Sequence, residues 1–586
     1  MTEEIYRVEL ATRGDKILRQ VADQPTSIYA CHALFVLDEK TDQVEGIVKR
    51  VFGGEKAGAF GRVAAGTFDV FAAMHLASRW QTQLSAGTLD HMRQIMTHGM
   101  HHRGNTENHW LMYYAGHLLA SEMWPDESAM WNGLRPDVVQ KEATRWLLGM
   151  MDRTARTGHH EYDSTQYHGW HVTPMIALAD HAKDEVLRKK AAQTATLLIA
   201  DMALEYFAGT WAGGHCREGY RQNTWRYVGT SAALMAYYFG DDTEDPLHIQ
   251  AGMCPAVTAH YQPPALLAEL ARERSVPRVI KKTKAPRTIY RYVDGETKPV
   301  RKYTYLSRSF ALGSTQVGLP GAPAGPIDLI SWDLTWDAPT QEGTVVCTHP
   351  YLDPGRFGAF LSESPQSIER NVASPKPYLQ SPDRLFGASP YEQMMQCENA
   401  MVVLYRIPED DRAPYVNLYL PRSVKWVERA GWIIGDMGSF YLGLRPVGAY
   451  RWESISEDGH VDGWLLRIED LHAGLVVEAV EADEVASFTA FCDAMVQRDL
   501  DLSEWHSHGV VCYEALNGRR LKMVYDGDHC VDGETIDYEA WPLYGGPGID
   551  APLGTGVIRF EQGDQKLVLD FDVDEKQAMI PMRVIG

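Results

Sequence analysis

The sequence predicts a multidomain α+β protein in which an N-terminal (α/α) toroid of helical hairpins precedes a large antiparallel β-sandwich. Two observations support this fold class. Apolar residues recur at helical spacing from about residue 64 to residue 275. Short apolar runs of β type, separated by turn signals, fill residues 303–586. Histidine follows the same division, because 16 of the 22 histidines precede residue 275.

The length of the chain, its net charge and its cysteine pattern exclude several classes of protein. A chain of 586 residues is too long for one ordinary core and should divide into two or three domains. The formal net charge of −22 argues against nucleic acid or an anionic membrane as the partner. The eight cysteines are scattered without a C-x-x-C pair, which argues against a disulfide framework and a zinc ribbon. The first residues lack the apolar region of a signal peptide, so we expect a cytoplasmic protein, or a periplasmic or secreted one if a signal was removed.

The first 275 residues carry the helical pattern. Residues 1–60 are an N-terminal segment of uncertain structure, in which residues 27–37 are compatible with a strand and receive no function. Residues 61–275 form the expected toroid, and Pro125, Gly158, Gly209 and Gly240 separate its helical runs. Helical hairpins in series often close into a ring whose inner helices point their ends at a central cleft. The expected helices span 63–80, 110–123, 138–151, 174–182, 186–207 and 224–239.

The second half carries the β pattern. Residues 276–302 are rich in Lys, Arg and Pro, and we interpret them as a linker or a peripheral strand. Residues 303–586 are expected to form the β-sandwich, with strands over 343–347, 400–405, 474–480 and 509–513. Hairpin turns are expected at Asp458-Gly459, Asn517-Gly518, Asp526-Gly527 and Asp532-Gly533.

Three short stretches of the first half, residues 106–110, 158–168 and 213–221, are dense in imidazole, phenol and carboxylate side chains. Each lies at the rim of an expected helix. Groups that move protons near neutral pH and gather at helix ends, not on solvated faces, indicate an active site. The sequence therefore favours an enzyme.

These stretches resemble the heparinase II/III-like and alginate-lyase-like polysaccharide lyases. Asn108-His109 at a helix start is similar to the Asn-His pair that opens an inner helix in that group. The segment 158–168, with Glu161, Ser164 and Tyr167-His168, resembles a Gly…Glu…Ser…Tyr-His segment, and residues 305–349 resemble the start of the sandwich domain. Two departures stand out: two residues separate Glu161 from Ser164 where the group has one, and His349-Pro350-Tyr351-Leu352-Asp353 replaces a His-x-His-x-Asp pattern.

The resemblance implies β-elimination at a uronic acid within an acidic oligo- or polysaccharide. A neutral donor, Asn108 aided by His109 or Arg217, would stabilise the enolate-like intermediate, and a tyrosine or histidine would take the C5 proton. The expected catalytic residues are Asn108, His109, Tyr167, Tyr220 and His349. The expected substrate-binding residues are Glu161, His160, His215, Arg217, Arg221 and Trp170. We expect no cofactor and no metal ligands, and a homodimer is compatible with the sequence.

Each candidate also has a structural interpretation. Asn108 fits a capping residue, and His109 fits a ring packed beside Trp110. Tyr167 fits an ordinary contact at a helix start, and tryptophans such as Trp170 are more often core than sugar platforms.

Two other functions compete with the lyase. A glycoside hydrolase on a similar toroid needs two carboxylic acids that flank the scissile bond. Glu161 and a carboxylate from another segment would form that pair. The remaining carboxylates are Glu107, Asp163, Glu205 and Glu218. A non-catalytic carbohydrate-binding protein is the third possibility, which the density of titratable groups disfavours.

Overall fold

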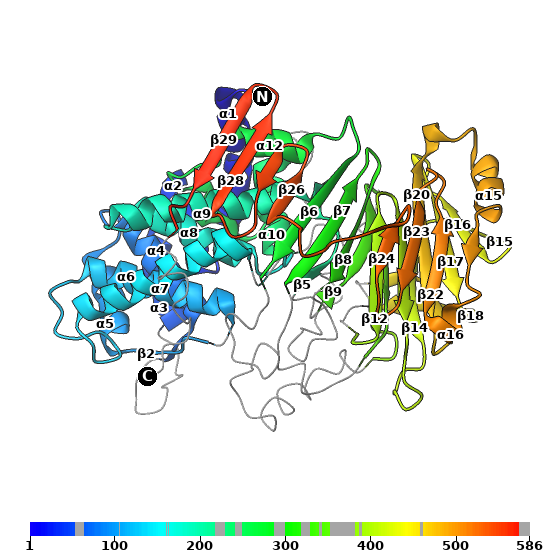
Figure 1. The fold of residues 1–586 in the computed structure, drawn as a ribbon. Helices are drawn as coiled ribbons and strands as arrows, with labels where there is room; N and C mark the ends of the chain where they lie inside the picture. Colours follow the sequence, from blue (N-terminus) through cyan, green and yellow to red (C-terminus); the bar gives the residue numbers. More distant parts are fainter. Residues whose placement is uncertain are drawn as a thin grey trace.

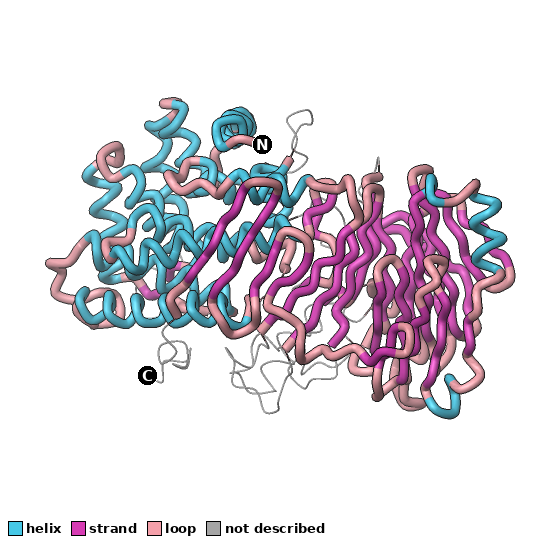
Figure 2. Tube along the Cα trace, turned by 45° about the horizontal axis from the view of Figure 1, so that its top comes forward, coloured by secondary structure: helices cyan, strands magenta, loops and turns pink. Residues whose placement is uncertain are grey.

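The computed structural model describes residues 1–52, 64–104, 106–159, 161, 163–216, 229–240, 249–285, 299–317, 329–338, 343–351, 381–385, 389–457 and 461–573. Its helices gather at one end of the molecule and its large sheets at the other (Figures 1 and 2). The predicted fold class, a helical N-terminal region followed by large antiparallel sheets, is confirmed.

The helical region contains long helices that pair as hairpins. Neighbours along the chain pack together, as α6 does with α7 and α8 with α9, while α4 also packs on α6. The helices are α1 (Glu3–Asp23), α2 (Cys31–Leu37), α3 (Val44–Phe52), α4 (Thr67–Trp80), α5 (Ala86–His98), α6 (Glu107–Met123), α7 (Pro136–Thr157), α8 (Gly169–His181), α9 (Glu185–Leu204), α10 (Thr230–Phe239), α11 (Cys254–Val257) and α12 (Ala265–Arg272).

One local prediction in this region was wrong. Residues 27–37, whose sequence is compatible with a strand, form the 3-10 turn Ile28–Ala30 and then helix α2. Cys31 and Leu34 are three residues apart and both are fully buried, which is the spacing of one helix face. Short apolar runs do not distinguish a strand from a buried helix, and here packing against α1 and α4 decides.

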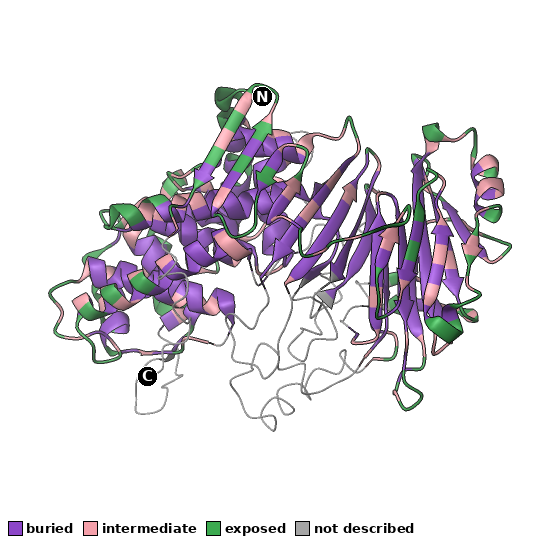
Figure 3. Cartoon of the chain, in the orientation of Figure 1, coloured by how far each residue is buried: buried purple, intermediate pink, exposed green. Residues whose placement is uncertain are grey.

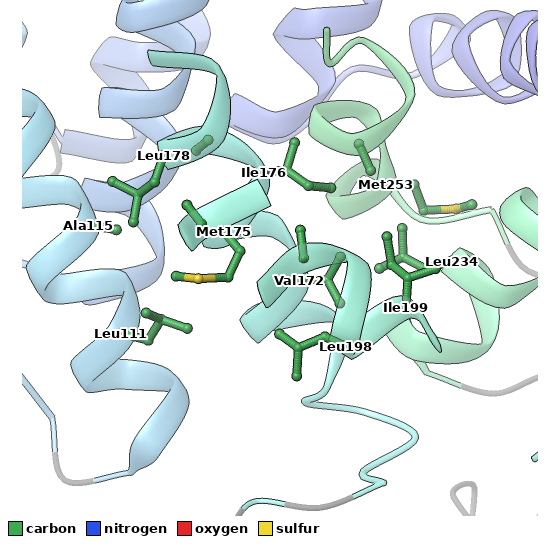
Figure 4. Packing of buried hydrophobic residues seen from close by; sticks show 14 of the residues in the cluster. Leu111, Ala115, Val172, Met175, Ile176, Leu178, Leu198, Ile199, Leu234 and Met253 are labelled. Atoms are coloured by element: carbon green, nitrogen blue, oxygen red, sulfur yellow. The ribbon is translucent and has the colours of Figure 1, made fainter. Parts of the chain in front are cut away.

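The core of the helical region lies between α6, α8, α9 and α10. Leu111 of α6 and Met175 of α8 are fully buried there, as are Leu198 of α9 and Leu234 of α10 (Figure 4). Each helix contributes one apolar stripe, and this packing fixes the ends of α6 and α8 relative to each other. Those two helix starts carry the candidate site.

The strands form three sheets, which we call long, middle and outer. The long sheet has the order β18-β19-β14-β11-β10-β8-β7-β6-β26-β27-β28-β29, the middle sheet β12-β13-β20-β17-β16-β15, and the outer sheet β21-β22-β23-β24-β25. All of their pairings are antiparallel. Three further two-stranded ladders pair β1 (Ala64–Ala65) with β2 (Met100–His101), β3 (Tyr206–Phe207) with β4 (Thr210–Trp211), and β5 (His215–Cys216) with β9 (Leu329–Ile330).

The bounds of the strands are as follows. The long sheet contains β6 (Arg278–Lys284), β7 (Val300–Leu306), β8 (Phe310–Val317), β10 (Trp332–Trp336), β11 (Thr344–Thr348), β14 (Val416–Pro421), β18 (Tyr450–Glu457), β19 (Val461–Ile468), β26 (Tyr544–Gly546), β27 (Ile549–Ala551), β28 (Val557–Gln562) and β29 (Gln565–Asp570). The middle sheet contains β12 (Glu392–Cys397), β13 (Ala400–Tyr405), β15 (Trp426–Arg429), β16 (Trp432–Asp436), β17 (Phe440–Val447) and β20 (Gly474–Glu481). The outer sheet contains β21 (Leu500–Asp501), β22 (Val510–Glu514), β23 (Arg520–Val524), β24 (His529–Val531) and β25 (Glu534–Thr535).

The sheets stack face to face around two cores. Leu312 and Leu418 of the long sheet meet Val403 and Leu475 of the middle sheet in one apolar cluster. The opposite face of the middle sheet packs on the outer sheet and on the short helices Phe488–Val496 and Trp505–His508. Because the middle sheet is covered on both sides, its strands β13 and β20 are buried along their whole length (Figure 3).

The long sheet also joins the two halves of the molecule. The described part of residues 276–302, interpreted above as a linker or peripheral strand, holds β6, which is hydrogen-bonded to β7 on one side and β26 on the other. The last strands extend the long sheet beyond the part that stacks on the middle sheet. Tyr544 and Phe560 belong to the core of the helical region, and β28 and β29 lie beside α12 (Figures 1 and 2). The C-terminal strands therefore pack with the N-terminal helices.

Candidate active site

A buried carboxylate caps the start of helix α6. The backbone N–H of Asn108 donates a hydrogen bond to Oε2 of Glu161 at 3.2 Å, and both residues are fully buried. First-turn N–H groups have no partner within a helix, and the helix dipole favours a negative charge at this end. Glu161 therefore fills the capping role that Asn108 was suggested to fill.

The Asn108 side chain is held at its oxygen. The Thr106 hydroxyl donates to Asn108 Oδ1 at 2.6 Å. Within the described part of the chain, Asn108 Nδ2 is buried and has no hydrogen-bond partner. A buried N–H group without a partner costs about 1–3 kcal/mol, so such a group usually marks a ligand position or a strained one. Asn108 thus offers a neutral donor whose backbone and oxygen are already fixed.

Three histidine rings cluster together, and one of them adjoins Glu161. His171 Nε2 lies 3.5 Å from Glu161 Oε2. The His159 ring packs on His171 at 4.3 Å between centroids and on His168 at 5.3 Å. His168 donates from Nε2 to the Leu198 carbonyl at 2.9 Å, and burial lowers its pKa to about 4. His168 is therefore a neutral, structural ring.

His171 has acceptors on both sides of its ring. Its Nδ1 lies 3.2 Å from the Tyr167 carbonyl, and its Nε2 faces the Glu161 carboxylate. The ring thus lies between the Tyr167 carbonyl and the Glu161 carboxylate, and it links the start of α8 to the Glu161 loop.

The loop that carries Glu161 begins where α7 ends. Gly158 follows α7 with a φ of +91°, and a side chain at this position would collide with the Thr283 carbonyl of β6. At the other end of the loop, the Tyr167 N–H donates to Ser164 Oγ at 2.9 Å, and Ser231 Oγ donates to the Ser164 carbonyl at 2.8 Å. These contacts place the start of α8 beside the start of α10.

Tyr167, Trp170 and His109 lie near the same two helix starts. Tyr167 is half-buried, in contrast to the fully buried Asn108. Trp170 packs on Phe68 at 5.2 Å and on Tyr29 at 5.3 Å between ring centroids. His109 packs edge-on against the same Phe68 ring at 5.3 Å. Both rings are thus in contact with the helical core, and their predicted roles stay predictions.

His215 lies where the third motif meets the long sheet. Its Nδ1 donates to the Gly213 carbonyl at 2.7 Å, while the Gly213 N–H donates to Asp333 Oδ1 of β10 at 2.6 Å. Burial lowers the pKa of His215 to about 4, and burial also raises the pKa of Asp333 well above its usual range. Gly213 itself faces Gly313 of β8, where a Cβ on Gly313 would come within 2.6 Å of the Gly213 Cα. Two glycines allow loop and strand backbones to touch.

His349 is surrounded by residues of the sandwich. Its Nδ1 lies 2.9 Å from Ser389 Oγ, and its Nε2 lies 2.9 Å from the Ala413 carbonyl and 3.5 Å from Asp411 Oδ1. Both ring nitrogens are therefore engaged away from Glu161 and Asn108. The remaining predicted residues, His160, Arg217, Tyr220 and Arg221, lie outside the described residues.

A ring of six buried charges lies beside the site, and the sequence interpretation missed it. Lys282, Lys284 and Lys302 alternate with Asp163, Asp201 and Glu205, and all six side chains are fully buried. The lysine Nζ atom lies 2.8 Å from the carboxylate in the Lys282–Asp201 and Lys284–Asp163 pairs, and 2.9 Å in the Lys302–Glu205 pair. We call this the charge ring; its formal charges sum to zero.

The charge ring joins two strands of the long sheet, the end of helix α9 and the loop that carries Glu161. Lys282 and Lys284 are two residues apart on one face of β6, and Lys302 of β7 lies directly opposite Lys282. Asp201 in the last turn of α9 and Glu205 just beyond it are four residues apart on one helix face. Three cations beside a helix C-terminus are also favoured by the helix dipole. Asp163 completes the ring from the loop that carries Glu161.

Sequence reasoning also passed over His171. Its position three residues after His168 and four after Tyr167 is helical spacing, and this was the available signal. For the ring, the signal was the alternation of Lys282 and Lys284 in a β-type run, which we interpreted as part of a linker or a peripheral strand.

Within the described residues, no set of three or more His, Cys, Asp or Glu side chains is arranged to hold a metal ion. None of the described helices combines the length and the apolar character that crossing a bilayer requires.

Comparison with known proteins adds little. No protein-family profile and no curated protein matches the sequence. Among solved structures, heparan sulfate lyase HepC from Pedobacter heparinus aligns with 83% of this chain and 81% of its own chain, at 7% sequence identity and a TM-score of 0.23. A TM-score this low carries no argument about function, so any proposal depends on the site itself.

Proposed function

We propose that the protein is a lyase that cleaves a uronate-containing oligo- or polysaccharide by β-elimination. The observation that carries the proposal is the Asn108 amide, a neutral donor that is fixed at a helix start and has a free N–H within the described residues. The resemblance of Asn108-His109 and of residues 158–168 to polysaccharide lyases supports the same chemistry.

The reaction needs a donor for the substrate carboxylate. The C5 proton of a uronic acid is weakly acidic until the adjoining carboxylate is neutralised, because negative charge develops on that carboxylate as the proton leaves. In the proposal, Asn108 Nδ2 donates to this carboxylate. A base removes the C5 proton, the C4–C5 double bond forms, the C4–O bond breaks, and an acid protonates the leaving oxygen.

Tyr167 is the proposed base and acid among the described residues. It is half-buried, and it lies four residues before His171 on the segment that opens α8. We assign His171 a supporting place instead, because it is buried between the Tyr167 carbonyl and the Glu161 carboxylate. Glu161 in turn holds the Asn108 backbone.

Two of the carboxylates that a glycoside hydrolase could have used as its general acid are bound by lysines. A general acid must be protonated near neutral pH. Burial alone would raise the pKa of Asp163, but Lys284 and Lys302 outweigh it and hold that pKa well below its usual range. Glu205 accepts from Lys282, Lys302 and Thr304 at once. Both carboxylates are committed to the charge ring.

The test is turnover of a panel of uronate-containing glycans, followed by the ultraviolet absorbance of the unsaturated uronate product. The proposal expects this chromophore with at least one glycan. Reducing ends without the chromophore would establish hydrolysis and overturn the lyase, and binding without either product would indicate a carbohydrate-binding protein.

Two variants then test the assigned roles. Asn108→Asp keeps the size of the side chain but replaces the donor with an anion, so we expect kcat to fall about 10²–10³-fold, as for other lost oxyanion donors. Tyr167→Phe should lower kcat by about 10²–10⁴-fold through loss of proton transfer. The matched control is Tyr114→Phe on α6, whose hydroxyl lies 3.4 Å from Glu142 and which should keep its activity. Wild-type kcat in Asn108→Asp or Tyr167→Phe would remove that residue from the reaction.

A further inference from the structure

The long sheet holds the Glu161 loop at both of its ends. At the first end, Gly158 lies so close to Thr283 and Lys284 that a Cβ on Gly158 would be 3.1 Å from the Lys284 Cα. At the second end, the Asp163 carboxylate is bound by Lys284 at 2.8 Å and by Lys302. Glu161 lies between these two attachments, two residues before Asp163.

The backbone at Asp163 depends on this attachment. Its φ is +52°, a left-handed conformation that residues other than glycine adopt at a cost. Such a conformation persists when surrounding contacts over-determine it, and two buried ammonium groups on one carboxylate provide that constraint.

Among the described residues, the ion pairs of the third lysine of the ring are with the end of α9. Lys282 binds Asp201 at 2.8 Å and Glu205 at 2.7 Å, both from the C-terminal end of α9. The ring therefore contains two kinds of ion pair: those that hold the loop through Asp163, and those that join the sheet only to α9.

We propose that Lys284 and Lys302 are positioning residues for the reaction: through Asp163 they hold Glu161 against the start of α6, and so hold Asn108 in place. This inference rests on the proposed function for its catalytic consequence. It also makes the sheet domain part of an active site whose reacting groups all come from the helical region.

The ring supplies matched variants that separate positioning from mere structural support. Asp163→Asn with Lys302→Met removes one carboxylate and one lysine that hold the loop. Asp201→Asn with Lys282→Met removes one carboxylate and one lysine from the same ring, but leaves Asp163 bound by Lys284 and Lys302. Each double variant leaves two cations and two anions, so neither leaves an unpaired buried charge.

The first readout is hydrogen–deuterium exchange in the full chain, which needs no substrate. The Asn108 N–H donates to Glu161, so loosening the loop should raise exchange in peptides that cover residues 106–112 and 158–168. We expect this increase in Asp163→Asn/Lys302→Met and not in Asp201→Asn/Lys282→Met. Equal exchange of these peptides in the two double variants would overturn the inference.

The second readout is kinetic and uses a glycan that the wild-type protein cleaves. Misplacing Asn108 should lower kcat about tenfold or more in Asp163→Asn/Lys302→Met, with KM changed much less, while the control double variant keeps its kcat. Equal kcat in the two variants would overturn the positioning role. If no glycan is cleaved, the proposed function fails, while the exchange comparison still decides whether the sheet holds the loop.

If the protein does not fold when Lys302 or Lys282 is replaced by methionine, single variants provide the test. Asp163→Asn and Asp201→Asn each keep all three lysines, and the same exchange and kcat comparison applies to them. A larger effect in Asp163→Asn supports the inference, and equal effects contradict it.

Discussion

The junction between helices and sheet buries carboxylates in one way, and the sandwich buries them in another. At the junction, Asp163 is surrounded by lysines; burial raises its pKa, but the lysine charges outweigh burial and the pKa stays well below its usual range. In the sandwich, Glu392 of β12 and Glu478 of β20 are also buried, and burial raises the pKa of each to about 7. Among the described residues, neither carboxylate accepts a hydrogen bond from lysine or arginine.

The partners of the sandwich carboxylates are hydroxyl and amide groups. Glu392 accepts from Tyr405 at 2.7 Å and from Ser331 at 2.8 Å, and Glu478 accepts from Tyr513 and from the Leu516 N–H at 2.7 Å. These donors only partly offset burial. The comparison teaches that a buried carboxylate stays charged when cations adjoin it, and otherwise becomes able to take up a proton near neutral pH.

The two regions should respond oppositely to pH. Asp163 has a folded-state pKa below its unfolded value, so its stabilisation is present above the unfolded pKa and is lost as pH falls through the folded one. Glu392 and Glu478 have folded-state values above the unfolded one, so their stabilisation is present below the unfolded pKa and is lost as pH rises to about 7.

The largest expected effect comes from breaking the charge balance of the junction. Lys302→Met leaves three buried carboxylates with two lysines, and removal of one partner of a buried pair typically costs about 3–5 kcal/mol of the free energy of unfolding. Asp163→Asn/Lys302→Met restores the balance and should recover most of that loss. Urea unfolding at neutral pH measures both, and an equal loss in the double variant would show that balance is not what the ring supplies.

A second effect belongs to the sandwich. The rise of the Glu392 pKa from 4.5 to about 7 corresponds to a loss of about 3 kcal/mol of stability between acid and neutral pH. Glu392→Gln cannot ionise, so its free energy of unfolding should fall less than that of the wild type as pH rises across this window. Glu398→Gln, on the turn between β12 and β13, is the control and should keep the wild-type slope. An unchanged slope in Glu392→Gln would mean that Glu392 does not titrate in this range.

The sequence predicted elements well where their pattern is local. The expected helix over 110–123 lies within α6, and the expected strand over 400–405 coincides with β13. The junction escaped prediction because its partners are far apart: Lys302 and Asp163 are separated by 139 residues. A lysine on a strand is ordinarily solvated, and only the approach of α9 and the Glu161 loop makes it buried.

Only part of the candidate site could be proposed from the sequence, because local motifs reveal only residues that are close together along the chain. Asn108 and Glu161 were both proposed as site residues from local motifs, and the structure brings them into direct contact. His349 was placed with them by resemblance alone, and its described partners all belong to the sandwich. Lys284 and Lys302 of the long sheet, which bind Asp163 beside Glu161, were singled out by no local motif.

The smallest expected effect compares one hydroxyl donor from each region. Thr304 donates to Glu205 of the charge ring at 2.6 Å, and Tyr405 donates to Glu392 at 2.7 Å. Thr304→Val should cost about 1–2 kcal/mol at about pH 5 and about pH 8 alike, because Lys282 and Lys302 bind the same carboxylate as Thr304. Tyr405→Phe should cost less at about pH 5, where Glu392 is protonated, than at about pH 8, where a buried carboxylate loses a donor. Urea unfolding of both variants at the two pH values gives four free energies. A pH-dependent loss in Thr304→Val, or a pH-independent loss in Tyr405→Phe, would contradict the contrast between a charged junction and a titrating sandwich.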